Sequence, residues 1–219
     1  MNADECVIYK GSFFQIEWYY DSDGKSQPYD YFQACDLSQK RKFLMLCQRM
    51  GDFGKILDEQ KFRNESDGIY AFKPQPDRYL CFFKKGKKII VTNAYRKQSQ
   101  KLPKCEKDLA LKNMADYLAR NPKYGGNKMT TFDKFFEENP DQKSIYEKEY
   151  NDFLLSEFML EKMAEENISI RELAKQANVS PTVIQKLRSK DAEKVTFTTF
   201  TSVLRCLGYQ IKLEKCPSH

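Results

Sequence analysis

The sequence predicts an α+β protein in which a small antiparallel sheet covered by helices precedes an all-α helix-turn-helix domain. Three observations predict this class. From Gly68 onward the apolar spacing changes from helical to short β-rich runs. Between about Ile168 and Leu207, two short helical patterns flank a tight turn. Residues 121–128 contain a proline and a Gly-Gly pair, which stop helices and strands alike, so we expect a new domain to begin at Met129.

The first half, residues 1–120, is predicted to form one α+β domain. Residues 8–20 hold two short aromatic-rich stretches that indicate strands, and residues 29–50 show mixed helical spacing that indicates one or two amphipathic helices. Pro103 starts a last helix that reaches about Ala119. Three β-rich runs joined by tight turns predict antiparallel strands at Ile69–Phe72, Tyr79–Phe83 and Ile89–Thr92.

The second half is predicted to be mainly helical. Ser169 and Glu172 form a capping box before the first short helix of the helix-turn-helix unit, and Ser180 and Pro181 start its second helix. We divide this half, after a linker at 121–128, into a helical segment at 129–167 and a DNA-binding domain at 168–219. Its other expected elements are helices at 132–139, 144–167 and 196–207 and a closing strand at 208–213.

Composition predicts a soluble, cytoplasmic globular protein without a cofactor. The 219 residues are 41% hydrophobic and 31% charged, and no apolar run approaches the ~18 residues of a membrane span. The first nine residues lack the order of a secretory signal. The seven cysteines are spaced singly and His219 is the only histidine, so we expect neither a metal site nor a disulfide framework.

Charge is divided unequally between the halves. Residues 1–128 contain 24 Lys and Arg against 16 Asp and Glu, a net charge of +8, whereas residues 129–219 contain 13 against 15, a net charge of −2. A basic half suggests a polyanionic partner. An acidic half in the same chain suggests a segment that binds the basic half and shields its charge.

Cations are predicted to gather where the strands of the first half end. The hairpins bring together the end of one strand, the start of the next and the residues after the third. The result is a cationic patch that contains a phenol and no carboxylate or histidine. Arg and Lys neutralise a phosphate, and a Lys or Tyr with a shifted pKa transfers protons, as RNA cleavage requires. The patch consists of Lys73, Arg78, Tyr95, Arg96, Lys97 and Lys101.

The order of residues in these strands resembles the HigB-like toxins of the RelE/ParE superfamily. Ser66–Lys73 reads SDGIYAFK, Arg78–Phe83 reads RYLCFF, and Lys87–Pro103 ends in AYRKQSQKLP. The family pattern is a D-G-[IL]-Y-E-hydrophobic-[RK] strand, an R-hydrophobic-hydrophobic-Y-F strand and a last strand leading into F-x-K-K-[ST]-x-K-x-P. The match covers roughly Tyr29 to Leu118. It implies a RelE-like fold and a metal-independent endoribonuclease that cuts mRNA on the ribosome.

The resemblance assigns roles by position. Lys73 and Arg78 match the strand cations that hold the phosphate, and the sequence departs from the pattern at Ala71, where an acidic residue is usual. Tyr95 replaces the usual phenylalanine, so it either transfers a proton or, as we favour, packs its ring. The candidate catalytic residues are Lys73, Arg78, Tyr95, Arg96 and Lys97. Lys84, Lys85 and Lys101 are candidate RNA contacts. By its spacing alone, the lysine run that contains Lys84 and Lys85 is typical of a solvated hairpin tip.

A short helix, a tight turn and a capped helix form the geometry that lets the second helix enter the DNA major groove. There Gln pairs with adenine, and Lys reaches guanine or phosphate. A helical hairpin that packs without DNA is the alternative that the pattern alone leaves open. The predicted DNA-binding residues are Ser180, Thr182, Gln185, Lys186, Ser189 and Lys190.

The pattern from Leu173 to Leu187 resembles the XRE/Cro family, and residues 150–215 resemble HigA-like antitoxins. Toxin followed by antitoxin resembles a type II HigBA pair in one chain. This implies an antitoxin half that neutralises the toxin by contact, within or between chains, and represses its own promoter as a homodimer on operator DNA. We expect residues 129–167 to make that contact and to leave the joined chain largely inactive as a nuclease. The acidic residues expected to oppose the basic face are Glu137, Glu138, Asp141, Glu147 and Glu149.

Other interpretations stay open on sequence alone. One is a transcriptional regulator whose first half is a catalytically inactive interaction domain, and another is a ParE-like toxin directed at gyrase. Because Met129 directly follows the Gly-containing stretch, two separate proteins joined artificially would give the same sequence.

Overall fold

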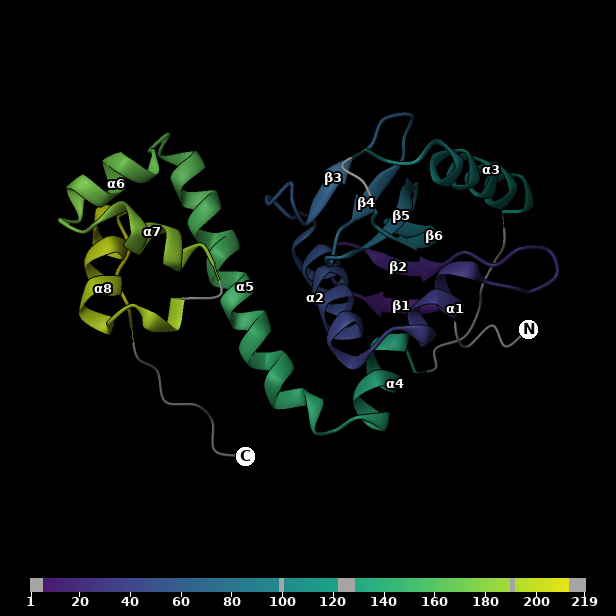
Figure 1. Cartoon of the computed structure of the whole chain (residues 1–219), viewed down its shortest axis with the longest axis horizontal. Coiled ribbons are helices and arrows are strands. Elements are labelled where there is room, and N and C mark those ends of the chain that lie inside the picture. Colours follow the sequence, from purple (N-terminus) through teal and green to yellow (C-terminus); the bar gives the residue numbers. More distant parts are fainter. Residues whose placement is uncertain (1–5, 99–100, 122–128, 190–191, 213–219) are drawn as a thin grey trace. The chain divides into compact units, whose positions relative to one another are not determined.

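The computed structural model describes residues 6–98, 101–121, 129–189 and 192–212, which form two compact units. The first unit is Met1–Tyr146 and the second is Glu147–His219 (Figure 1). The expected linker lies outside the described residues except for Asn121. The chain has the predicted α+β class, with a sheet in the first unit and helices in the second.

A six-stranded sheet forms the centre of the first unit, in the order β1-β2-β6-β5-β4-β3. The antiparallel pairs β4–β5 and β5–β6 confirm the three strands expected after Gly68. The edge strand β3 was not predicted, and neither was the parallel pairing of β2 with β6, which joins segments far apart in the sequence. The strands are β1 (Val7–Lys10), β2 (Gln15–Trp18), β3 (Phe62–Asn64), β4 (Tyr70–Phe72), β5 (Asp77–Lys84) and β6 (Lys88–Arg96).

Two helices, α1 (Gln27–Ala34) and α2 (Leu37–Phe53), occupy the segment expected to hold one or two. Asp36 separates them because its carboxylate caps the start of α2 in a capping box with Gln39. On the α2 side of the sheet, the ring of Phe43 stacks on Tyr79 with centroids 3.9 Å apart, and Trp18 stacks on Phe43 at 5.4 Å. This aromatic cluster is the core on one face of the sheet.

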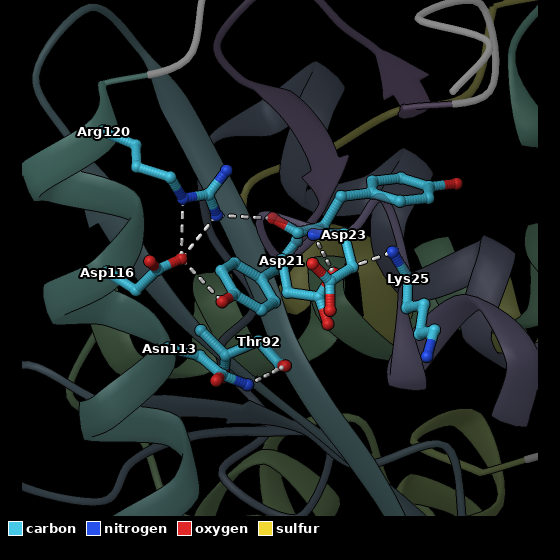
Figure 2. A network of polar contacts seen from close by, with 9 residues as sticks. Asp21, Asp23, Lys25, Thr92, Asn113, Asp116 and Arg120 are labelled. Atoms are coloured by element: carbon cyan, nitrogen blue, oxygen red, sulfur yellow. Dashed lines mark hydrogen bonds and ion pairs between the residues drawn. The ribbon is translucent and has the colours of Figure 1, made fainter.

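Helix α3 (Lys104–Arg120) covers the other face, where Ala110 and Tyr117 pack against apolar side chains of the sheet. Polar contacts hold it in place (Figure 2). Asn113 Nδ2 donates a hydrogen bond of 2.9 Å to the backbone oxygen of Thr92 in β6. The Asp116 carboxylate accepts hydrogen bonds from Tyr19 at 2.7 Å and from Arg120 Nε at 2.9 Å. The helix is therefore anchored to the sheet along its C-terminal half.

Helix α4 (Thr131–Glu138) and the start of α5 (Gln142–Glu165) pack within the first unit. The indole N–H of Trp18 donates a hydrogen bond of 2.9 Å to the hydroxyl of Thr131. The ring of Phe132 lies 5.0 Å from that of Tyr9 in β1. The Tyr146 hydroxyl donates a 2.6 Å hydrogen bond to Gln48 in α2. Residues 131–146 thus complete the first unit beside β1 and α2.

The second unit contains the remainder of α5 and four short helical elements. Leu173, Ile184 and Val203 meet in one core with Met159 and Met163 of α5. The expected closing strand is wrong for the described part, because Gly208–Lys212 form no strand; Leu213 lies outside it. The elements are α6 (Ile170–Gln176), α7 (Pro181–Leu187), the 3₁₀ helix η2 (Ala192–Lys194) and α8 (Phe197–Cys206).

Candidate nucleic-acid interfaces

A cavity of about 450 Å³ opens in the first unit where β4 ends, β5 begins and β6 ends. Five of the six predicted patch residues line it, all except Arg96, so the hairpins do bring these strand ends together. The residues lining the cavity are Glu59, Gln60, Arg63, Glu65, Lys73, Gln75, Arg78, Tyr95, Lys97, Lys101 and Leu102.

Arg78 and Tyr95 are opposite each other in the antiparallel register of β5 and β6. Side chains at such positions lie on the same face with Cβ atoms about 5 Å apart. Arg78 is buried, and its guanidinium donates a 2.7 Å hydrogen bond to the backbone oxygen of Asp77. The pKa of Arg78 is lowered, mainly by burial. Arginine nevertheless stays charged in proteins, so the cavity holds a fixed cation.

The carboxylate of Asp77 supports Arg78 from the opposite face of the sheet. It is buried and accepts hydrogen bonds from the Tyr31 hydroxyl at 2.6 Å and from Gln39 Nε2 at 2.9 Å. These donors come from α1 and α2, so both helices fix the start of β5. Helices α1 and α2 therefore both fix the backbone next to Arg78.

Lys73 extends past the end of β4, and its ammonium donates a 2.8 Å hydrogen bond to the backbone oxygen of Glu59. Its pKa is lowered, first by burial and then by the positive charge of Arg78. A lysine whose pKa is lowered in this way gives up its proton more readily than a solvated lysine does. Lys73 is therefore a candidate both for binding a phosphate and for transferring a proton.

Tyr95 lines the cavity while its ring packs against the core under α3. Burial raises its pKa to about 12, against the opposing effect of the Arg78 charge. The phenol is therefore protonated at neutral pH and is a proton donor rather than a base. Both interpretations of Tyr95 left open by the sequence are compatible with this position.

The prediction that the patch contains no carboxylate is wrong, because Glu59 and Glu65 line the cavity. Both flank β3, the strand that sequence reasoning missed, and Glu65 lies at the β3–β4 turn. The Asp67-Gly68 pair was the available signal, since such a pair between β-rich runs indicates a hairpin. Ala71, where the family pattern has an acid, is buried beneath α3 and does not face solvent.

Three predicted site residues lie away from the cavity. Arg96 pairs with Asp77 in the register, so its side chain is on the opposite face from Tyr95, where its charge acts on Tyr31. Lys84 and Lys85 are at the far end of β5 from Arg78. The Lys84 ammonium lies over the ring of Tyr117 at 4.8 Å and donates to Asn121 at 2.7 Å.

The second unit contains the predicted helix-turn-helix as α6, a turn and α7. Ser169 and Glu172 form the predicted capping box, whereas Ser180 occupies the N-cap of α7 without a side-chain capping bond. Ile184 and Leu187 are buried, which turns Thr182 and Gln185 to solvent and leaves Lys186 half-buried. The exposed Ser189 bonds to the backbone of Lys186, and Lys190 lies outside the described residues. Ser180 is also exposed.

Within the described part of the chain, no helix is long and apolar enough to cross a membrane. No group of three or more His, Cys, Asp or Glu side chains there is arranged to hold a metal ion.

The fold and the two surfaces define the class of the chain: an α+β domain with a basic cavity, joined to a helix-turn-helix domain. Comparison with known families agrees with this division. Residues 30–115 match the family described as Phage derived protein Gp49-like (DUF891), which is related to RelE-type toxins. Residues 159–212 match the Cro/C1-type HTH DNA-binding domain. A search of curated proteins found no match. Together the two domains fit a toxin–antitoxin fusion.

Proposed function

We propose that the chain is a HigBA-type toxin–antitoxin system in one polypeptide, with an mRNA endoribonuclease in its first unit. The observation that carries the proposal is the cavity in which Lys73, Arg78, Tyr95 and Lys97 meet. It lies within the segment that matches the toxin-related family. Its charge and its phenol suit a phosphodiester substrate, and mRNA on the ribosome is the substrate that the HigB resemblance implies.

The reaction needs three things that this cavity offers. Arg78 and Lys73 stabilise the charge that develops on the scissile phosphate. A base accepts the proton of the 2′-hydroxyl, and an acid protonates the leaving 5′ oxygen. Lys97 and Lys101 extend the positive surface along the RNA backbone. Arg96, Lys84 and Lys85 have no part in the chemical step under this proposal, because they lie away from the cavity.

Under this proposal the second half neutralises the first, and residues 131–146 attach it to the first unit, where none of them lines the cavity. Several of their contacts join neutral side chains, among them Thr131 with Trp18 and Phe132 with Tyr9. Glu137, Glu138 and Asp141 are exposed and do not belong to the lining of the cavity. Residues 131–146 therefore bind beside β1, and restraint of the nuclease does not depend on these three acids. We propose that the joined chain is largely inactive as a nuclease.

The second unit is proposed to bind operator DNA of its own promoter as a homodimer, with α7 in the major groove. Thr182 and Gln185 are exposed on the face of α7 opposite its buried residues, where they reach base edges. Lys186 and Ser189 reach phosphates, and so does Lys190, which follows them in sequence.

Expression of residues 1–146 tests the nuclease proposal. Residues 1–146 are preferred to residues 1–128, because the shorter fragment lacks Thr131, whose hydroxyl accepts the hydrogen bond of the Trp18 indole N–H. We expect growth arrest and new 5′ ends in translated mRNA, mapped by RNA end sequencing, and weaker effects from the full chain. The matched control is the same fragment with Arg78→Ala. Intact mRNA with DNA damage would favour a gyrase-directed toxin, and neither effect would favour a regulator with an inactive first half.

A further inference from the structure

We propose that Glu65 accepts the proton of the RNA 2′-hydroxyl, and that Tyr95 protonates the leaving 5′ oxygen. This assignment rests on the nuclease proposed above and names its acid–base pair. Neither the composition of the predicted patch nor the family pattern assigns a carboxylate to this position.

Glu65 is placed among the groups that act on the phosphate. It lines the same cavity as Lys73, Arg78 and Tyr95. Its negative charge raises the pKa of all three, which places its carboxylate within electrostatic reach of each. Glu59, the other carboxylate among the residues lining the cavity, is more exposed, and its backbone oxygen is what binds Lys73. Glu65 is thus the better-placed base.

The turn that carries Glu65 is held rigidly. The Glu65 N–H donates 2.8 Å to the backbone oxygen of Ile69, which closes the β3–β4 hairpin. Ser66, Asp67 and Gly68 all have positive φ, a run that allows this tight reversal. Lys107 of α3 forms an ion pair of 2.7 Å with Asp67 and also bonds to Ser66. Because α3 is fixed to the sheet, the backbone that carries Glu65 is held in place before substrate arrives.

Tyr95 complements Glu65 chemically, because a phenol can donate a proton and a carboxylate can accept one. A phenol whose pKa is about 12 keeps its proton at neutral pH. The cavity therefore offers an acceptor at the β3–β4 turn and a donor on β6, with Lys73 past the end of β4 and Arg78 on β5. Acid–base cleavage of a phosphodiester needs both an acceptor and a donor within reach of the reacting groups.

The proposed step is balanced without a metal or another reactant. The 2′-hydroxyl loses its proton to Glu65 as its oxygen forms a bond to phosphorus. The bond between phosphorus and the 5′ oxygen breaks, and that oxygen takes the proton of Tyr95. The products are a 2′,3′-cyclic phosphate and a 5′-hydroxyl end. Arg78 and Lys73 carry the charge of the pentavalent state.

The test measures whether Glu65 contacts a 2′-hydroxyl, using the full chain and small probes that the helix-turn-helix does not read. Binding of adenosine 3′-phosphate and of its 2′-deoxy analogue is measured by NMR titration, with the other three nucleotide pairs in parallel. The wild-type chain should bind the ribonucleotide about tenfold more tightly, because the hydrogen bond is to a charged acceptor. Glu65→Ala should bind both forms equally. The matched control Glu59→Ala should keep the preference.

The possible outcomes separate the two proposals. If the wild type and Glu65→Ala prefer the ribonucleotide to the same extent, or if neither prefers it, the assignment of Glu65 is overturned while phosphate binding remains. If no 3′-phosphate binds, or if Arg78→Ala leaves binding unchanged, the phosphate site itself fails and the nuclease proposal fails with it. As a second readout, Glu65→Gln in residues 1–146 should lower the cleavage rate about 100-fold or more while nucleotide affinity holds.

Discussion

Replacing Thr131 by valine tests the way residues 131–146 join the first unit. The Thr131 hydroxyl accepts the indole N–H of Trp18 at 2.9 Å, and both side chains are buried, with Trp18 at 0% and Thr131 at 6% exposure. Valine has nearly the shape of threonine, so packing changes little while the indole N–H loses its acceptor and the Val7 backbone oxygen loses the Thr131 hydroxyl, 3.4 Å away, as a donor. A buried donor left unpaired costs about 1–3 kcal/mol in the free energy of unfolding.

Trp18 is the only tryptophan in the chain, so its fluorescence reports the unfolding of the first unit alone. With a urea dependence of roughly 2 kcal/mol per molar for a domain of this size, Thr131→Val should lower the urea midpoint by about 0.5–1.5 M. Thr182→Val, at an exposed position in the second unit, is the control and should shift it by less than about 0.2 M. An equally small shift for Thr131→Val would refute the contribution of this hydrogen bond.

Further predictions concern the two surfaces. Arg78→Lys in residues 1–146 should reduce mRNA cleavage about 10²–10³-fold with unchanged circular dichroism, because one fixed donor to the phosphate is lost; near-normal cleavage would exclude Arg78 from the site. Tyr95→Phe should lower the single-turnover cleavage rate about 100-fold or more, whereas a ring that only packs would leave it unchanged. Folding raises the pKa of this phenol to about 12, so its stabilising effect holds below pH 10 and disappears as the pH rises from 10 toward 12. Urea midpoints of the wild type should therefore fall more steeply than those of Tyr95→Phe over that range. Lys186→Ala should weaken operator binding, measured by fluorescence anisotropy, and should lower the slope of log affinity against log salt concentration by about one. The control Lys143→Ala should change neither quantity.

Local patterns in the sequence predicted the elements that depend on local chemistry. The capping box of Ser169 and Glu172 and the turn before Pro181 are defined within a few residues, and the structure confirms both. The antiparallel strands after Gly68 are likewise neighbours in sequence joined by short turns. For this reason the sequence correctly predicted that Lys73, Arg78 and Tyr95 lie close together.

The missed features depend on long-range pairing or on segments too short to show a period. Strand β3 has three residues and lies at the edge of the sheet, so no alternation marks it, and Glu59 and Glu65 were missed with it. The parallel pairing of β2 with β6 is specified by packing on both faces rather than by a turn. Arg96 was assigned by its place beside Lys97, but alternation along β6 directs neighbouring side chains to opposite faces.

The contacts of residues 131–146 also predict how the two halves behave once the chain between them is cut. Thr131, Phe135, Gln142 and Tyr146 are all buried, so the start of the second half is part of the first unit rather than loosely tethered to it. Cleavage at a protease site inserted within residues 122–128 should therefore leave the two halves bound at micromolar concentration, co-eluting in size-exclusion chromatography. Phe135→Asp should separate them, because it buries a charge without a partner. Separation of the cut wild-type halves would mean that the covalent link, and not this interface, holds the two halves together.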